Sequence, residues 1–222
     1  MIKAVVFDLD ETLISRAGAI RAFIADQYLR HAEELQDIDR YTYIGKFLSM
    51  EDNGRIPKDL VYPAFVAELN ITGIDAHELL EDYRIVYPTF ATLNPGARKT
   101  LEAAKAAGLA TAVISNGNAR VQNAKLESIG IAHLLDVIII SEAVGLRKPD
   151  PAIFYLATGR LGIEPEATLF VGDNPTADIV GAAGVGMQTA WFRNGEIWPE
   201  NLLPRADVDI DRLEEILSFP GK

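Results

Sequence analysis

A mainly apolar run at the N-terminus, which ends in two acidic residues, is the feature that most constrains how this chain can fold. The run extends from Ile2 to Phe7 and leads directly into Asp8 and Asp10. A short apolar run bounded by polar turn residues predicts a buried strand. Because alternate side chains at the end of a strand point to the same side, the two carboxylates can face one small volume, unless the turn begins between them. In open α/β sheets, ligands bind in that volume, beyond the carboxyl ends of the strands.

Two carboxylates this close repel each other unless a cation or a proton lies between them. Carboxylate oxygens suit a hard ion such as Mg²⁺. The alternative interpretation is that Asp8 or Asp10 only caps the helix that follows. The Asp-x-Asp pattern by itself leaves both interpretations open, because so short a motif also occurs by chance.

From about residue 95, apolar runs that predict strands alternate with stretches that predict helices. The predicted strands cover residues 110–115, 137–140, 168–172 and 188–192, with a short edge strand at 208–210. The predicted helices include 119–129, a helix that begins at Pro151 after a capping Asp150, and the segments 179–183 and 213–219. This alternation implies a mainly parallel sheet covered on both faces, and therefore a three-layer, Rossmann-like α/β core.

Residues 15–91 have helical spacing of apolar side chains and no convincing strand. The spacing of Tyr41, Ile44 and Leu48 predicts the second helix of this stretch. We therefore expect a core made of residues 1–14 and 92–222, with residues 15–91 inserted as an all-helical cap. Among the cations of the insert, Arg16 is the candidate for a substrate contact, because it follows the acidic turn closely.

Composition excludes several kinds of function. The 222 residues carry a net charge of −11, which argues against binding to nucleic acid or to anionic membranes, since both require clustered Lys and Arg. The absence of cysteine excludes disulfides, thiolate metal sites and cysteine nucleophiles. No apolar run approaches the ~18 residues of a membrane span, and no signal peptide is recognised. We expect a cytoplasmic monomer or homodimer with no nucleic-acid or membrane partner.

Three further stretches place polar residues next to predicted strands and helices. Ser115 and Asn116 follow one apolar run, Lys148 precedes the helix that Asp150 caps, and Asp173 and Asp178 follow another apolar run. In this order, and together with Asp8-x-Asp10-x-Thr12, they resemble the haloacid dehalogenase-like hydrolase superfamily. Its pattern is DxDxT, a Ser or Thr after a strand, a Lys, and GDxxxD or GDxxxxD. All four parts are present, the resemblance covers the whole chain, and it implies the same α/β core with a helical cap.

Phosphoryl transfer needs a nucleophile, neutralisation of the phosphate oxygens and protonation of the leaving group. Asp8 is the candidate nucleophile and Asp10 the general acid, which later activates water; the resemblance implies the same two roles. Mg²⁺ is expected as cofactor, held by Asp8 and Asp173 and, by analogy with the family, by the backbone carbonyl of Asp10. The substrate is expected to be a small phosphate ester, and its phosphate is expected to contact Thr12, Ser115, Asn116 and Lys148, with Asp178 orienting the metal ligands from behind.

One position departs from the commonest family pattern, because Glu11 stands where DxDGT has glycine. A non-glycine residue does not easily adopt a positive φ, so we expect a turn that glutamate tolerates. Asp10 favours a phosphatase or phosphomutase over a dehalogenase, since family dehalogenases lack an acid at that position. The sequence thus predicts a Mg²⁺-dependent phosphatase that acts through an aspartyl phosphate, with a sugar phosphomutase or a non-catalytic binding protein as alternatives.

Overall fold

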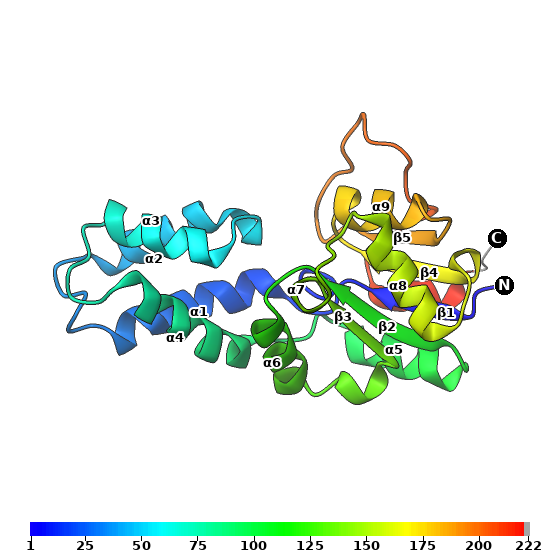
Figure 1. Cartoon of the computed structure of the whole chain (residues 1–222), viewed down its shortest axis with the longest axis horizontal. Helices are drawn as coiled ribbons and strands as arrows, with labels where there is room; N and C mark the ends of the chain where they lie inside the picture. The colour runs from blue at the N-terminus through cyan, green and yellow to red at the C-terminus, as the bar shows by residue number, and fades with distance from the viewer. Residues whose placement is uncertain (220–222) are drawn as a thin grey trace. The chain divides into compact units, whose positions relative to one another are not determined.

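The chain forms two compact units in the computed structural model, which describes residues 1–219 (Figure 1). The first unit contains Met1–Ser15 and the chain from Thr92 onward, and the second contains Arg16–Ala91. Within the described residues, no helix has both the length and the apolar character that crossing a bilayer requires.

The first unit is built on a six-stranded sheet with the strand order β3-β2-β1-β4-β5-β6. Each described pairing between neighbouring strands is parallel, which confirms the predicted parallel α/β core. The strands are β1 (Ala4–Phe7), β2 (Ala110–Ser115), β3 (Val137–Ile140), β4 (Thr168–Gly172), β5 (Gln188–Phe192) and β6 (Val208–Ile210).

The position of β1 determines where a ligand can bind. It lies between β2 and β4, and Phe7 is in register with Val113 on one side and Val171 on the other. The strand order reverses at β1, and the carboxyl ends of parallel strands next to such a reversal form the usual ligand crevice. Asp8 therefore emerges beside the ends of β2 and β4, and its backbone N–H still donates to the Val171 carbonyl at 2.9 Å.

Helices cover both faces of this sheet (Figure 1). On one face, α8 packs Ile153, Phe154 and Ala157 against apolar side chains of β1, β2 and β4. On the other face, α5 packs against β2 and the 3₁₀ helix Leu213–Ser218. The helices of this unit are α5 (Ala97–Ala106), α6 (Ala119–Ile129), α7 (Ser141–Val144), α8 (Pro151–Leu161) and α9 (Gly181–Ala183).

Two segments of this unit that are predicted as α-helices have another helical form in the structure. The sequence predicts a helix over residues 213–219, and the structure has a 3₁₀ helix at Leu213–Ser218. So short a segment gains few α-helical hydrogen bonds to offset the cost of starting a helix. Residues 179–183 divide between a π-helical segment, Pro175–Val180, and the single turn α9.

The second unit contains four α-helices, which are α1 (Arg16–Arg30), α2 (Arg40–Glu51), α3 (Lys58–Glu68) and α4 (Ala76–Val86), and two short 3₁₀ helices, Asp52–Gly54 and Tyr87–Phe90. The side chains that indicated α2 are not the ones that it buries completely: Tyr43 and Phe47 are fully buried, whereas Tyr41 is 84% exposed. Tyr43 and Phe47 have helical spacing, as do Tyr41, Ile44 and Leu48. Tyr43 and Phe47 pack edge-to-face on Phe65 of α3. Aromatic partners on the neighbouring helix therefore decided which face turned inward.

A buried glutamine connects the helices of the second unit. The Gln27 side chain is fully buried. Its Oε1 accepts from the hydroxyls of Tyr43 and Tyr62 at 3.0 and 3.2 Å, and its Nε2 donates to the Leu79 carbonyl at 3.0 Å and to Asp82 at 2.8 Å. All four hydrogen-bonding positions of one amide are thus satisfied by α2, α3 and α4.

Replacing this glutamine tests the network. Gln27→Leu is expected to destabilise the second unit by about 2–4 kcal/mol, because two hydroxyls and a carbonyl lose a partner inside the core. Thermal unfolding followed by circular dichroism measures the effect. Arg21→Leu, at an exposed position of the same helix, is the control and is expected to change stability by less than about 0.5 kcal/mol. Equal stability of the two variants would contradict the prediction.

Candidate active site

The turn after β1 carries Asp8, Asp10 and Thr12, and it is closed by its own backbone. The Glu11 N–H donates to the Ile14 carbonyl at 2.7 Å, and the Ile14 N–H donates to the Leu9 carbonyl at 2.8 Å. Glu11 has φ 64°, so the turn keeps the left-handed conformation that favours glycine. The expectation of a turn suited to glutamate was therefore wrong in its geometry. Asn194 donates to the Glu11 carboxylate at 3.0 Å, which helps to hold the side chain of this residue.

Lys148 brings two of the predicted acids together. Its Nζ lies 2.5 Å from Asp8 Oδ1 and 2.7 Å from Asp178 Oδ1. Asn116 fixes the lysine from the neighbouring loop, because its side chain accepts from the Lys148 N–H at 2.9 Å and donates to the Lys148 carbonyl at 3.0 Å. Burial lowers the pKa of Lys148, but the attraction of Asp178 and Asp8 outweighs it, and the net pKa is raised. The lysine is therefore a fixed positive charge.

Asp173, which is partly exposed, completes an acidic cluster with the buried Asp8 and Asp178. One carboxylate oxygen from each of the three lies within 4.8 Å of the others. Burial raises the pKa of Asp8 to about 7 even though Lys148 opposes the shift. Burial, followed by the charges of Asp8 and Asp178, raises the pKa of Asp173 to about 9. One lysine thus leaves an excess of negative charge among these carboxylates.

The donor set fits a hard cation. Three carboxylates supply oxygen ligands, which is the type that Mg²⁺ and Ca²⁺ prefer. Asp178 is the acid least available to bind a cation, because its Oδ1 pairs with Lys148 and its Oδ2 accepts from the Asn174 N–H at 3.0 Å. A Cβ at Gly172 would overlap the Asp178 carboxylate. The glycine that ends β4 is therefore required for the acid to reach this position.

Two predicted phosphate ligands have partners within the protein. The fully buried Thr12 hydroxyl accepts from the Asp173 N–H at 3.1 Å and donates to Asp173 Oδ1 at 3.3 Å. Thr12 thus ties the turn after β1 to the loop after β4. Ser115 is also buried, and its Oγ accepts from Gln122 at 2.6 Å. Both residues lie at the predicted edge of the sheet, and their phosphate contacts stay predictions.

The Asp10 carboxylate is not one of the three clustered acids, and it contacts two side chains of α6. Lys125 Nζ is 2.7 Å from Asp10 Oδ1 and 3.0 Å from Oδ2, and Gln122 Nε2 is 2.7 Å from Oδ2. The sequence reasoning missed both α6 residues. Gln122 and Lys125 occupy the same helix face as the buried Val121, Leu126 and Ile129. Polar residues on an otherwise apolar helix face are the signal that could have found them.

Arg16, the predicted substrate contact of the insert, belongs to a buried ion-pair group in the second unit. Its guanidinium binds the Glu51 carboxylate, with Nη1 at 3.2 Å from Oε1, and Lys58 Nζ lies 3.0 Å from the same carboxylate. Both Arg16 and Glu51 are buried. These contacts give Arg16 a role in packing the insert.

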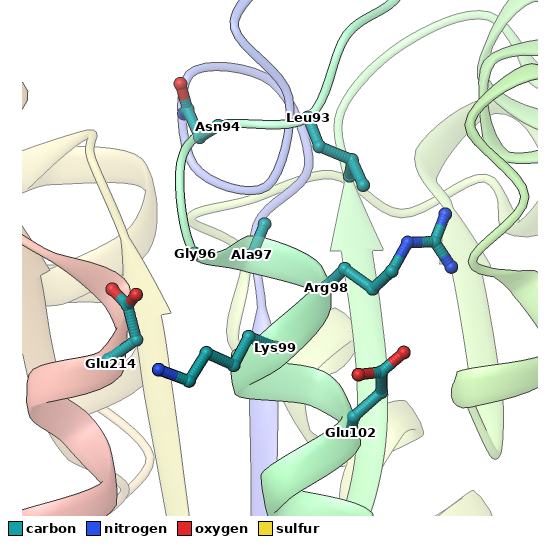
Figure 2. A pocket seen from close by; sticks show the side chains of 8 residues that line it. All are labelled: Leu93, Asn94, Gly96, Ala97, Arg98, Lys99, Glu102 and Glu214. Atoms are coloured by element: carbon teal, nitrogen blue, oxygen red, sulfur yellow. The ribbon is translucent and has the colours of Figure 1, made fainter.

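A separate hollow of about 440 Å³ lies at the N-terminus of α5 (Figure 2). None of the residues that line it was predicted for the site. Glu214 already faces the helix end, where a Cβ on Gly96 would overlap its carboxylate. Asn94 on the rim points the other way and donates to the Thr12 carbonyl at 2.8 Å. The loop before α5 therefore supports the turn that carries Asp8 and Asp10.

Comparison with known proteins gives the family. The model of haloacid dehalogenase-like hydrolases matches residues 2–186. The chain belongs to this family. A glyceraldehyde 3-phosphate phosphatase from Methanopyrus kandleri is 32% identical, with 98% of this chain and 96% of that enzyme aligned. A phosphoserine phosphatase from Thermus thermophilus is 36% identical over 64% of this chain and 56% of its own length.

The fold of the chain is that of the family. The crystal structure of a haloacid dehalogenase-like phosphatase from Thermococcus onnurineus superposes with a TM-score of 0.73 at 29% identity, covering 100% of this chain and 99% of that one. The predictions of a haloacid dehalogenase-like hydrolase and of a Rossmann-like α/β fold are confirmed.

Removing divalent metal is expected to make the stability of this hydrolase depend on pH. Without a cation, Asp8 and Asp173 have raised pKa values of about 7 and about 9, whereas an unfolded aspartate has a pKa of about 3.9. The folded state therefore binds more protons, and its stability falls between about pH 5 and pH 9 by up to about 1.4 kcal/mol per pH unit for each excess proton. The melting temperature in EDTA at pH 5.5, 7 and 8.5 measures this fall.

Asp173→Asn is the control for this measurement, because it removes one of the two carboxylates and should flatten the dependence. Added Mg²⁺ should raise the melting temperature most at pH 8.5, where the carboxylates are most fully ionised. A melting temperature that rises with pH in EDTA would contradict the expectation.

Proposed function

We propose that this chain is a Mg²⁺-dependent phosphomonoesterase that hydrolyses small phosphorylated metabolites through an aspartyl phosphate on Asp8. The proposal depends on one contact: Lys148 Nζ lies 2.5 Å from Asp8 Oδ1. The carboxylates of Asp173 and Asp178 lie beside it. A nucleophile held against a fixed cation suits attack on an anionic phosphate, because the cation offsets the repulsion between the two.

The relatives support the same reaction. The Methanopyrus enzyme, aligned over nearly all of this chain, is named as a phosphatase of a small phosphorylated metabolite, and the prediction of a phosphoric monoester hydrolase is confirmed. Asp10 supports phosphate ester cleavage, because an alkoxide leaving group needs a proton and a halide does not. A three-carbon sugar phosphate is the substrate class that we would test first.

The reaction proceeds in two steps. Asp8 attacks the phosphorus atom, the bond to the ester oxygen breaks, and Asp10 gives its proton to that oxygen as the alcohol leaves. Asp10, now a carboxylate, then takes a proton from water as the water oxygen attacks the phosphorus of the aspartyl phosphate. Phosphate leaves, and the Asp8 carboxylate is regenerated. Lys148 stays protonated and lies against the phosphate oxygens in both steps.

Asp8 and Asp173 would hold the metal ion, with the Asp10 backbone carbonyl as a third ligand. Asp178 would orient this group, because both of its oxygens already have partners in Lys148 and Asn174. When bound, Mg²⁺ would neutralise phosphate charge next to the nucleophile. The raised pKa values of Asp8 and Asp173 support a cation here, since they reflect a charge imbalance that a divalent ion relieves.

The helical insert would act as the cap that selects the substrate and excludes water. The two chain segments that lead into it and out of it run side by side at the core, where the Ser15 N–H donates to the Thr92 carbonyl at 2.9 Å. Two adjacent connections of this kind suit a hinge.

Hydrolysis of p-nitrophenyl phosphate tests the proposal. The wild type is expected to release p-nitrophenol with Mg²⁺ and not with EDTA, and Asp8→Asn is expected to lower kcat by at least about 10³-fold, because the amide cannot form the acyl phosphate. Asp37→Asn, at an exposed position of the insert, makes the same chemical change and should leave the rate unaltered. Equal rates for the wild type and Asp8→Asn would exclude Asp8 as nucleophile. Failure of the wild type on this ester and on a panel of sugar phosphates would reject the hydrolase function.

A further inference from the structure

We propose that Lys125 and Gln122 are positioning residues that hold the Asp10 carboxylate in place for its two proton transfers. This inference rests on the proposed function, in which Asp10 is the acid and base of the reaction. Neither residue belongs to the four-part pattern that placed the chain in its family. Both lie on α6, more than 110 positions away from Asp10 in the sequence.

Two side chains of α6 donate hydrogen bonds to the Asp10 carboxylate. Lys125 Nζ reaches both Asp10 oxygens, at 2.7 and 3.0 Å, and Gln122 Nε2 reaches Oδ2 at 2.7 Å. The two side chains are three positions apart on a helix, so they project from the same face. Two donors from one rigid helix therefore fix the rotation of the carboxylate as well as its position.

The burial of the lysine argues against an incidental surface pair. The Lys125 side chain is only 3% exposed, whereas the Asp10 side chain is 23% exposed. Withdrawing an ammonium group from water is costly, and the cost is offset only by well-placed acceptors. The carboxylate is thus anchored from its protein side, while part of its surface stays accessible to a substrate.

Gln122 also links Asp10 to the loop after β2. The same Nε2 that contacts Asp10 donates to Ser115 Oγ at 2.6 Å. A Cβ at Gly117 would lie 3.2 Å from Gln122 Nε2 and 3.3 Å from Cδ and Cγ, with φ at 153°. A side chain at position 117 would therefore crowd the glutamine, and the glycine leaves it room. The Gln122 amide therefore holds both Asp10 and Ser115, a predicted phosphate ligand.

Asp10 needs such support because it lies beyond the strand. Asp8 is fixed by its backbone bond to β4 and by Lys148. Asp10 instead lies in the turn, and displacement of a reacting group by about 1 Å can cost about 100-fold in rate. Lys125 and Gln122 supply from α6 the positioning that the strand supplies to Asp8.

Two aryl phosphates of similar size test the proposal through their leaving groups. Phenol has a pKa of about 10, like tyrosine, so its departure is assisted by a proton from Asp10. Nitrophenolate is a much weaker base and leaves with little help. Lys125→Met is therefore expected to lower kcat/KM at least about 10-fold for phenyl phosphate and less than about 3-fold for p-nitrophenyl phosphate. Lys125→Arg should restore most of the loss, and Gln122→Leu should show the same selectivity with a smaller effect.

Three controls separate this role from others. Lys105→Met removes a surface ion pair of the same unit, Lys105 to Asp136 at 2.5 Å, and should not change kcat/KM for either ester. In an Asp10→Asn background, Lys125→Met should have no further effect on the leaving-group ratio, because the two residues act as one unit. Melting temperatures report whether each variant folds.

The outcomes are distinct. Equal losses of kcat/KM on the two esters, or a full effect of Lys125→Met in the Asp10→Asn background, would overturn the positioning role and leave the hydrolase mechanism intact. Full activity of Asp8→Asn in the same assays would instead reject the mechanism itself. The inference would also be overturned if the wild type cleaved p-nitrophenyl phosphate but Asp10→Asn cleaved phenyl phosphate with the same kcat/KM as the wild type.

Discussion

The charge balance around Lys148 is the constraint on which the site depends. Asp8, Asp173 and Asp178 contribute carboxylate oxygens to one buried volume, and Lys148 contacts two of these acids. Buried carboxylates are unfavourable unless they are paired, protonated or bound to a cation. One lysine balances one negative charge, so a further cation beside Asp8 would relieve the imbalance that remains. The same arrangement accounts for the raised pKa values of Asp8 and Asp173.

The sheet makes this arrangement possible. β1 lies at the reversal of strand order, and its neighbours β2 and β4 end at the same edge. Hydrogen bonds then connect the loops at this edge: Thr12, after β1, with Asp173, after β4, and Asn116, after β2, with Lys148 in the loop before α8. Thr12 and Asn116 thus each hold a candidate site residue of a different loop. Asp10 follows the same design, with α6 as its support.

Much of the core could be predicted from the sequence, because local patterns determine it. The bounds of β2, β3, β4, β5, α6 and α8 agree with the predicted ranges, since apolar runs, a capping Asp150 and terminal glycines mark them within the chain. Prediction was weaker where two local patterns competed. On α2, Tyr41 and Tyr43 both fit a helical stripe, and packing against Phe65 selected Tyr43. Glu11 has a positive φ, which non-glycine residues disfavour, because the turn after β1 requires that conformation.

The sequence by itself determined the family, the parallel α/β core and the identity of Asp8, Asp10, Lys148, Asp173 and Asp178 as candidates, because ordered motifs and strand ends are local features of the chain. Only the tertiary structure decided which partners these residues have. Lys125 and Gln122 reach Asp10 across more than 110 positions of sequence, and Arg16 is drawn to Glu51 in the insert. Such contacts depend on how helices and loops pack around the sheet, and neither spacing nor residue type records that packing.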